Sequence, residues 1–229
     1  MPVGDSELAA TLAAVAQALA AEPTPAAVVQ RACSLARETI SACDHADVMV
    51  AAASGTLTVP AATDWVGIRV VSYEEQCGEG PCIDAFRTGT MVNVPDHNTE
   101  TRWPRFTQRC LADTPVRSGV GLPLLVGKRA IGALDLYADR PHAFNDEDRA
   151  AAALFASHAA VALVAVQDRI NLERALATRD VIGQAKGILM AESHVTGDQA
   201  FDMLKRASQH LNQKLNSIAQ DIVDKHDKP

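Results

Sequence analysis

The chain has 229 residues, of which 48% are hydrophobic and only 4% aromatic, and its formal net charge is −7. This length accommodates one ordinary domain and one smaller one, and abundant alanine favours helices over an all-β fold. The negative charge argues against indiscriminate nucleic-acid binding. The charge is unevenly distributed, because residues 1–169 hold 13 Lys+Arg against 20 Asp+Glu, whereas residues 170–229 hold 8 of each.

The N-terminal stretch does not resemble a secretory signal. Residues 1–21 are apolar, but they lack a basic segment and include Asp5 and Glu7. We see no apolar run of the roughly 18 to 20 residues that a bilayer span requires. We therefore expect a cytoplasmic protein with no membrane segment.

The five cysteines are odd in number and form no CxxC pair. Cys77 and Cys82 flank a Gly-Glu-Gly-Pro loop, where a redox or metal site is conceivable. Zinc would need two further well-placed ligands, and His97 and Cys110 are only loosely positioned for that role. We predict reduced, structural cysteines and no metal site.

The first part of the chain alternates between helical and strand patterns. The expected helices cover residues 6–21, 26–41, 63–76 and 81–87, and a polar loop over residues 96–106 leads into a further helix that ends near Ala112. The expected strands cover residues 46–51, 56–59 and 91–94. Thr24 and either Thr63 or Asp64 are placed to cap helices, while Ser54 and Gly55 mark a turn. Residues 118–125 and 130–137 form the clearest hairpin. The pattern predicts an α+β fold with an antiparallel sheet flanked by helices.

One long helix is expected from Asp146, capped by Asn145, to about Met190. Leu163, Val166 and Ile170 are spaced like a coiled-coil seam, which indicates a dimerising helix. An unmarked break near Asn171, giving two helices, is the alternative.

Two short amphipathic helices follow, beginning near Thr196 and Ser217. Neither is long enough to be stable alone, so we expect them to pack on the end of the long helix as a three-helix unit.

The stretch from Arg179 to Met190 places Gly183 and Gly187 among apolar residues and cations. Each glycine inside a helix costs about 1 kcal/mol relative to alanine. Small residues permit close approach of another backbone or of a ligand. Spacing alone favours tight helix–helix packing over a partner-facing surface.

No Walker loop, GxGxxG, HExxH or GxSxG motif is present, so we assign no catalytic residue and no metal ligand. Trp103 and Phe106, beside Arg102 and Arg105, either line a small-molecule pocket or cover the sheet. The three-helix unit carries cations suited to nucleic acid, but Asp198, Asp202 and Asp221 weaken a DNA-binding reading. RNA loops can be recognised with fewer cations.

The C-terminal sequence resembles the ANTAR domain. The resemblance is carried by Arg179-x-x-Ile182-x-x-Ala185-Lys186-Gly187-Ile188-Leu189-Met190 and by the two helices after it. The front of the chain is similar to a GAF domain, through Gly78-Glu79-Gly80-Pro81-Cys82, residues 102–106 and residues 132–137. On this basis we expect a GAF sensor domain over residues 1–165 and an ANTAR domain over residues 166–229.

The resemblance implies an RNA-binding transcription antitermination regulator that acts as a homodimer. It would bind tandem RNA hairpins in nascent transcripts and favour the antiterminator over the terminator, while its GAF domain senses a signal such as a small molecule. The RNA-binding residues that the resemblance implies are Arg179, Gln184, Ala185, Lys186, Gly187, Ser208, Asn212 and Lys214. No motif identifies a cofactor. A ligand-sensing dimeric interaction module and a DNA-binding regulator are the alternatives.

Overall fold

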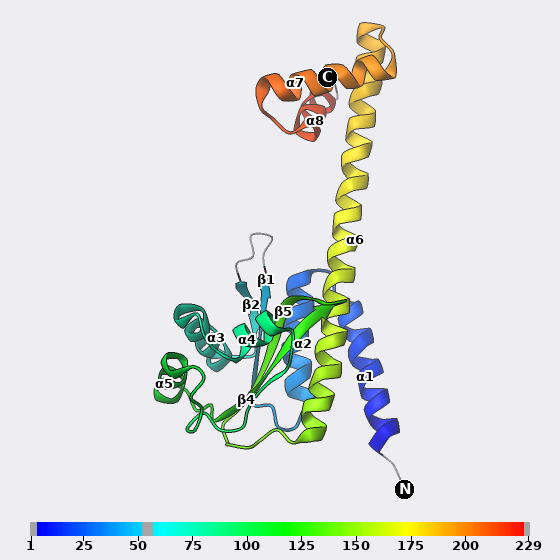
Figure 1. The fold of residues 1–229 in the computed structure, drawn as a ribbon. Helices are drawn as coiled ribbons and strands as arrows, with labels where there is room; N and C mark the ends of the chain where they lie inside the picture. Colours follow the sequence, from blue (N-terminus) through cyan, green and yellow to red (C-terminus); the bar gives the residue numbers. More distant parts are fainter. Residues whose placement is uncertain (1–3, 52–56, 227–229) are drawn as a thin grey trace. The chain divides into compact units, whose positions relative to one another are not determined.

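The computed structural model describes residues 4–51 and 57–226, which form two compact units, Met1–Gln167 and Asp168–Pro229 (Figure 1). The helices are α1 Gly4–Ala20, α2 Pro25–Thr39, α3 Trp65–Cys77, α4 Pro81–Thr88, α5 Pro104–Asp113, α6 Asp146–Ser193, α7 Gly197–Leu211 and α8 Leu215–His226. The strands are β1 His45–Ala51, β2 Leu57–Ala62, β3 Val92–Val94, β4 Ser118–Val126 and β5 Arg129–Ala138. The turn expected at Ser54 and Gly55 lies outside the described residues.

The first unit is built on one antiparallel sheet with the strand order β2-β1-β5-β4-β3. The predicted hairpin is confirmed as β4 and β5, and Gly127 in its turn has a φ of 62°, which glycine adopts without strain. In the central pair, Asp47 of β1 lies directly opposite Asp135 of β5. Two carboxyl groups therefore meet on one face of the sheet.

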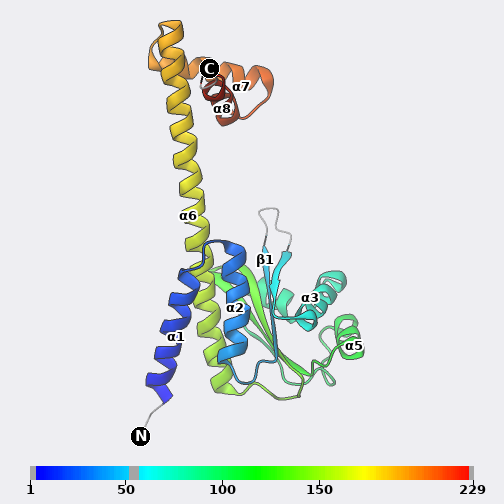
Figure 2. The same ribbon diagram turned by 180° about the vertical axis from the view of Figure 1, so that it is seen from behind.

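Helices cover both faces of this sheet. Figures 1 and 2 show α3 and α5 on one side of the strands, and α1, α2 and the first part of α6 on the other. The α3–α5 side contains a core that includes Met49, Ala133 and Tyr137 from the strands. Because side chains alternate along a strand, Leu134 and Leu136 face the opposite layer. The expectation of an α+β domain with a flanked antiparallel sheet is confirmed.

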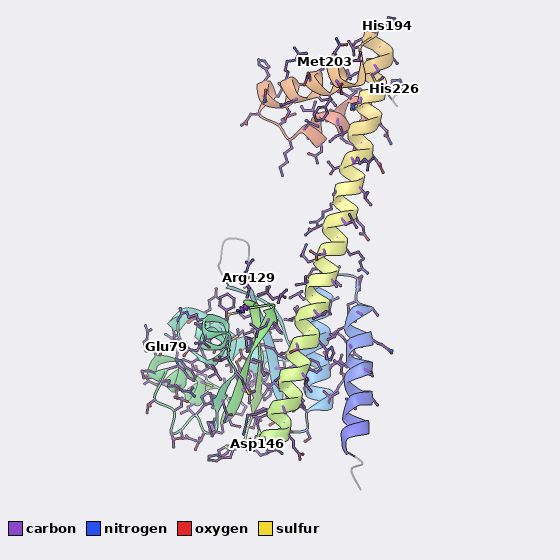
Figure 3. The ribbon with its side chains drawn as sticks, turned by 45° about the vertical axis from the view of Figure 1, so that its right-hand side comes forward. Glu79, Arg129, Asp146, His194, Met203 and His226 are labelled. Carbon is purple, nitrogen blue, oxygen red and sulfur yellow. The ribbon has the colours of Figure 1, made fainter. Side chains whose placement is uncertain are left out.

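Local capping explains where several of these helices begin. Thr24 accepts a hydrogen bond from the Ala27 amide, and Asp64, one of the two candidate caps, accepts from the amides of Val66 and Gly67. The α5 helix has no cap of its own, but the carboxylate of Glu79 accepts from the amides of Arg105 and Phe106 (Glu79 is labelled in Figure 3). The loop before α4 is thus tied to the start of α5.

The long helix α6 is continuous for 48 residues, as the sequence predicts, and Asn145 accepts a hydrogen bond from the Asp148 amide at its start. The expected coiled-coil seam is wrong, because Leu163 and Val166 are buried within the same chain. Together with Phe155 and Ala159 they belong to the core of the first unit. Apolar residues at coiled-coil spacing predict that one face of a helix is buried, but they do not predict which part of the structure covers that face.

The expectation that no apolar run is long enough to cross a bilayer is also corrected by α6. Among the described helices it alone combines the length and composition of a membrane span, with an 18-residue window of mean hydropathy 1.8. The run is rich in alanine, which raises hydropathy without large side chains. Of that window, 44% is buried inside the structure, as in the core helix of a globular domain.

The second unit consists of the end of α6 with α7 and α8. Its buried core contains Ala185 from α6, Leu204 from α7 and Ile218, Ala219 and Val223 from α8. His194 ends α6 with a left-handed φ of 53°, at the position labelled in Figure 3. Thr196 then forms a capping box with Gln199 at the start of α7. Ser217 is not a cap, because α8 begins at Leu215 and the Ser217 amide already donates to the Lys214 carbonyl.

Candidate functional site

One face of α6 in the second unit carries both cations and glycines. Successive residues of an α-helix are about 100° apart, so Arg179, Gly183 and Lys186 fall within about 60° of one another and Gly187 lies at the edge of the same face. We call these four residues the cation–glycine face. Arg179, Gly183 and Gly187 are exposed, and Lys186 is half-buried.

The side of α6 opposite this face packs into the three-helix core. Val181, Ala185 and Leu189 belong to that core cluster, and by helical geometry Ala185 lies about 100° from Lys186, the nearer edge of the cation–glycine face. Ala185 is completely buried, so its assignment as an RNA-contacting residue is corrected. Gln184 is exposed but projects about 120° or more from both cations.

The two glycines of the face are not packing sites. A Cβ atom added at Gly183 or at Gly187 would meet no atom within 4 Å. The tight helix–helix packing that spacing alone favours is therefore absent at both positions. Since a helical glycine costs about 1 kcal/mol relative to alanine, these residues leave accessible backbone without any gain in packing.

Lys186 is held at the start of α7. Its ammonium lies 5.8 Å from the centre of the Phe201 ring, within the range of a cation–π contact. The same nitrogen is 3.7 Å from the point where a side chain at Gly197 would begin. The lysine nitrogen is therefore in ordinary van der Waals range of the first turn of α7, and no ion pair among the described residues includes Lys186.

The remaining candidates gather at the other end of α7. Asn212 forms its C-cap in the left-handed conformation, with a φ of 51°. The Ser208 hydroxyl donates to the carbonyl of Gln213 and so closes the α7–α8 turn, and Lys214 beside it is exposed. The 15 residues of α7 span about 22 Å. The candidate residues thus form two groups, one at each end of α7.

In the first unit, the carboxyl groups of Asp47, Glu74 and Asp135 are all completely buried. Burial raises the pKa of Asp135 to about 7 and, together with the Asp135 charge, raises the pKa values of Asp47 and Glu74 well above their usual range. Burial also raises the pKa of the neighbouring Cys82 thiol. Sequence reasoning passed over Asp47 and Glu74, although an aspartate inside the apolar strand 46–51 is a detectable anomaly.

Trp103 and Phe106 belong to the closed core of the same unit. The Trp103 indole donates to the Asp84 carboxylate at 2.8 Å, and Phe106 packs edge-on against His97 with 5.9 Å between ring centres. Neither residue lines the cavities found in the described part of the structure. A ligand-binding role for them stays a prediction.

An open cavity of the first unit lies between α2, β2 and α3. Its volume is about 430 Å³, within the range of small-molecule sites. Its lining is mixed, with apolar side chains such as Ile68 and Val71 beside the polar groups of Gln30, Ser72 and Glu75.

Two family models match the chain, one for the GAF domain over residues 22–164 and one for the ANTAR domain over residues 171–223. The expected pairing of these two domains is confirmed. No curated protein sequence matches the chain significantly.

Solved structures share the fold of the first unit. The GAF domain of an Acinetobacter phosphoenolpyruvate-protein phosphotransferase superposes with a TM-score of 0.57 at 12% identity, covering 72% of this chain and 97% of that one. The free methionine-R-sulfoxide reductase of Neisseria meningitidis, in complex with its substrate, gives 0.57 at 16% identity, covering 71% and 91%. A bacteriophytochrome from R. palustris gives 0.61 at 14%, covering 87% and 46%.

Proposed function

Because the chain belongs to the GAF domain family and also carries an ANTAR domain, we propose that it is an RNA-binding transcription antitermination regulator. In this proposal the ANTAR domain binds tandem RNA hairpins of a nascent transcript, and the GAF domain senses a small molecule. Both domains are regulatory, so we infer no enzymatic activity. We place the protein in the cytoplasm, where transcripts form, with α6 serving as a core helix of a soluble domain.

The observation that carries the proposal is the open backbone of the cation–glycine face. Gly183 and Gly187 leave accessible helix surface beside two cations, Arg179 and Lys186. An RNA loop could approach this backbone closely while its phosphates or base edges meet the cations. A surface used only for helix packing would need neither the cations nor the open space.

The group at the other end of α7 supplies a second point of contact. Lys214 is exposed, and Asn212 presents both hydrogen-bond donors and acceptors on an exposed cap. With about 22 Å along α7 between the two groups, one domain is suited to an extended RNA element rather than to a single nucleotide. Asn212 and Lys214 are therefore retained as RNA contacts, and Ala185 is not.

The test is binding of a two-hairpin RNA by the full chain, measured by fluorescence anisotropy near physiological salt. Lys186→Glu and Arg179→Glu should each weaken binding by tenfold or more, a loss of about 1.4 kcal/mol or more per substitution. Lys128→Glu, at an exposed lysine in the β4–β5 turn, is the matched control and should have no such effect.

The same assay separates the alternatives. Unchanged affinity in both variants would refute the assigned face. If no RNA binds, the chain is better described as an interaction module. If duplex DNA competes more strongly than hairpin RNA, it is a DNA-binding regulator.

A homodimer is the second part of the proposal, and α6 provides a surface for it. Leu154, Val161, Leu172 and Leu176 are 47%, 65%, 63% and 50% exposed. Leu154 and Val161 share one face of α6 in the first unit, and Leu172 and Leu176 share one face of α6 in the second. Each apolar pair is suited to the same pair of a second copy.

This surface is tested by light scattering after size exclusion. The double variant Val161→Asp and Leu172→Asp should convert a dimer to a monomer, whereas Ile68→Asp, at an apolar residue on α3 that is 60% exposed, should not. A wild-type protein that is monomeric at micromolar concentration would refute this part of the proposal and leave the RNA face untouched.

A further inference from the structure

The core of the GAF domain contains a cluster of metal-ligating atoms outside the RNA-binding unit. Asp47 and Asp135 face each other across β1 and β5, and Cys82 reaches them from α4. One ligand atom from each of the three lies within 4.8 Å of the others. Ligand atoms at about 2.0 to 2.3 Å from one ion in tetrahedral geometry are about 3.3 to 3.8 Å apart, so shifts of up to about 1 Å would bring these atoms onto one ion.

The buried carboxyl groups of this cluster have too few hydrogen-bond donors. The four oxygens of Asp47 and Asp135 are inaccessible, and only the Tyr137 hydroxyl and the Cys82 thiol approach them as donors, neither in a well-formed hydrogen bond. Oε2 of Glu74 is also inaccessible and has no partner among the described residues. Each of these two donors carries one proton, which cannot satisfy five buried carboxylate oxygens, so the cluster indicates a missing positive ligand.

Among the described groups that shift the pKa values of Asp47, Glu74 and Asp135, none is a basic side chain. The pKa of Asp47 is raised by the charge of Asp135 and lowered by a hydrogen bond from Tyr137, and neither group is a cation. Glu74 adds a third carboxyl group, whose Oε1 accepts from the Cys82 amide at 2.9 Å. Like charges at this separation repel strongly in a low-dielectric interior unless protons or a metal ion neutralise them.

Two glycines make room for the carboxyl groups. A Cβ at Gly121 would lie 2.8 Å from Oδ1 of Asp135, and one at Gly80 would overlap the carboxyl group of Glu74. Gly80 also has a φ of 152°, which other residues rarely adopt. The Gly-Glu-Gly-Pro-Cys loop therefore shapes the space beside Cys82.

We propose that Asp47, Cys82 and Asp135 bind a divalent first-row transition-metal ion, with Glu74 as a further carboxyl group beside the site. A thiolate among the ligands favours such ions over Mg²⁺ and Ca²⁺, which prefer oxygen donors alone. On binding, the Cys82 thiol and any protonated carboxyl group release their protons to solvent. Of the two cysteines that flank the loop, only Cys82 belongs to the site. The proposal is independent of RNA binding.

The test uses the full-length protein, stripped with a chelator and titrated with Co²⁺. We expect one Co²⁺ per chain, a thiolate-to-cobalt charge-transfer band in the near ultraviolet, and displacement of that band by Zn²⁺. Elemental analysis of protein purified without a chelator should find about one transition-metal ion per chain. Cys82→Ser should abolish the band, and Asp135→Asn should weaken Co²⁺ binding by more than about tenfold.

Cys43→Ser is the matched control. Cys43 is also buried, but Asp47, Cys82 and Asp135 are not among the groups that shift the pKa of its thiol. This variant should leave the band and the stoichiometry unchanged. Circular dichroism checks that each variant is folded, and the wild-type titration decides the question even if a variant is not.

Two results would overturn the proposal. One is folded wild-type protein that takes up no stoichiometric Co²⁺ or Zn²⁺. The other is an infrared carbonyl band of protonated carboxyl groups that persists unchanged when these ions are added, since protons would then neutralise the cluster.

Discussion

At the scale of single residues, His97 shows how burial alone sets a protonation state. The ring is completely buried, and neither nitrogen has a hydrogen-bond partner among the described residues. Burial lowers its pKa from 6.5 to about 4, although Glu100 and Asp96 act in the opposite direction. Between these two values the unfolded chain binds a proton that the folded domain does not.

His97 should therefore make the GAF domain less stable in acid. The free energy of unfolding should fall by about 3 kcal/mol on this account as the pH drops from about 6.5 to about 4. His97→Leu should remove that part of the loss, and the difference between variant and wild type in urea unfolding at pH 7 and pH 4 measures it. Equal losses in both proteins would contradict the prediction.

The glycines of the cation–glycine face predict opposite effects on stability and on binding. Gly183→Ala and Gly187→Ala should each stabilise the second unit by about 0.5 to 1 kcal/mol, because the added methyl groups meet open space and favour the helix. Each should also weaken RNA binding by blocking close approach. Thermal unfolding and anisotropy on the same samples measure both effects.

Asn171→Ala is the control for this pair, since it also replaces a poor helix former by alanine on an exposed part of α6. It should stabilise the helix and leave RNA affinity unchanged. Glycine variants that bind RNA as well as wild type would show that the open backbone is not used.

The role of a single residue could be predicted where it depends on its neighbours in the sequence. It could not be predicted where it depends on a distant segment of the chain. Thr24 could be placed as a cap because capping depends on a few neighbouring residues. Ala185 packs with Val181 and Leu189 as its helical spacing predicts, and its complete burial there conflicts with the RNA contact that the motif implies. The pairing of Asp47 with Asp135 depends on strand register between residues 88 positions apart, so no local pattern indicates it.

At the scale of elements, α7 depends on the capping box at its start. Thr196 accepts from the Gln199 amide at 3.3 Å, and the Gln199 side chain accepts from the Thr196 amide at 2.9 Å. Thr196→Ala should destabilise the three-helix unit by about 1 kcal/mol, whereas Thr196→Ser should retain most of the stability. Chemical unfolding followed by circular dichroism compares the two. A serine variant as unstable as the alanine variant would exclude the hydroxyl as the cause.

The elements themselves were largely predictable, because helix caps, glycine stops and alternating strands are local signals. Gly78 and Gly89 end α3 and α4 in the left-handed conformation. Which face of the sheet each helix covers could not be predicted from the sequence. Leu163 and Val166 have the spacing of a dimer seam, yet both side chains are buried within the first unit of the same chain.

At the scale of the whole molecule, the separation of charge limits how RNA can bind. The acidic excess lies in residues 1–169, whereas residues 170–229 are neutral overall. Binding must therefore rest on a few local cations, and its dependence on salt should be shallow.

Lys186→Gln tests this limit. Removing one phosphate contact should reduce the slope of log affinity against log salt by about 0.7 for single-stranded RNA segments. Lys128→Gln should leave the slope unchanged. Anisotropy titrations at several KCl concentrations measure both slopes, and an unaltered slope in Lys186→Gln would mean that this lysine meets a base edge or no RNA at all.

The burial of all five cysteines has a practical consequence. Alkylating reagents attack thiolates that they can reach, so the native chain should react slowly and an opened chain quickly. Four of the five sulfurs come from separate helices: Cys33 from α2, Cys77 from α3, Cys82 from α4 and Cys110 from α5. The order in which these cysteines become labelled should therefore show which parts of the first unit unfold locally before the others. The protein thus carries its own set of footprinting probes.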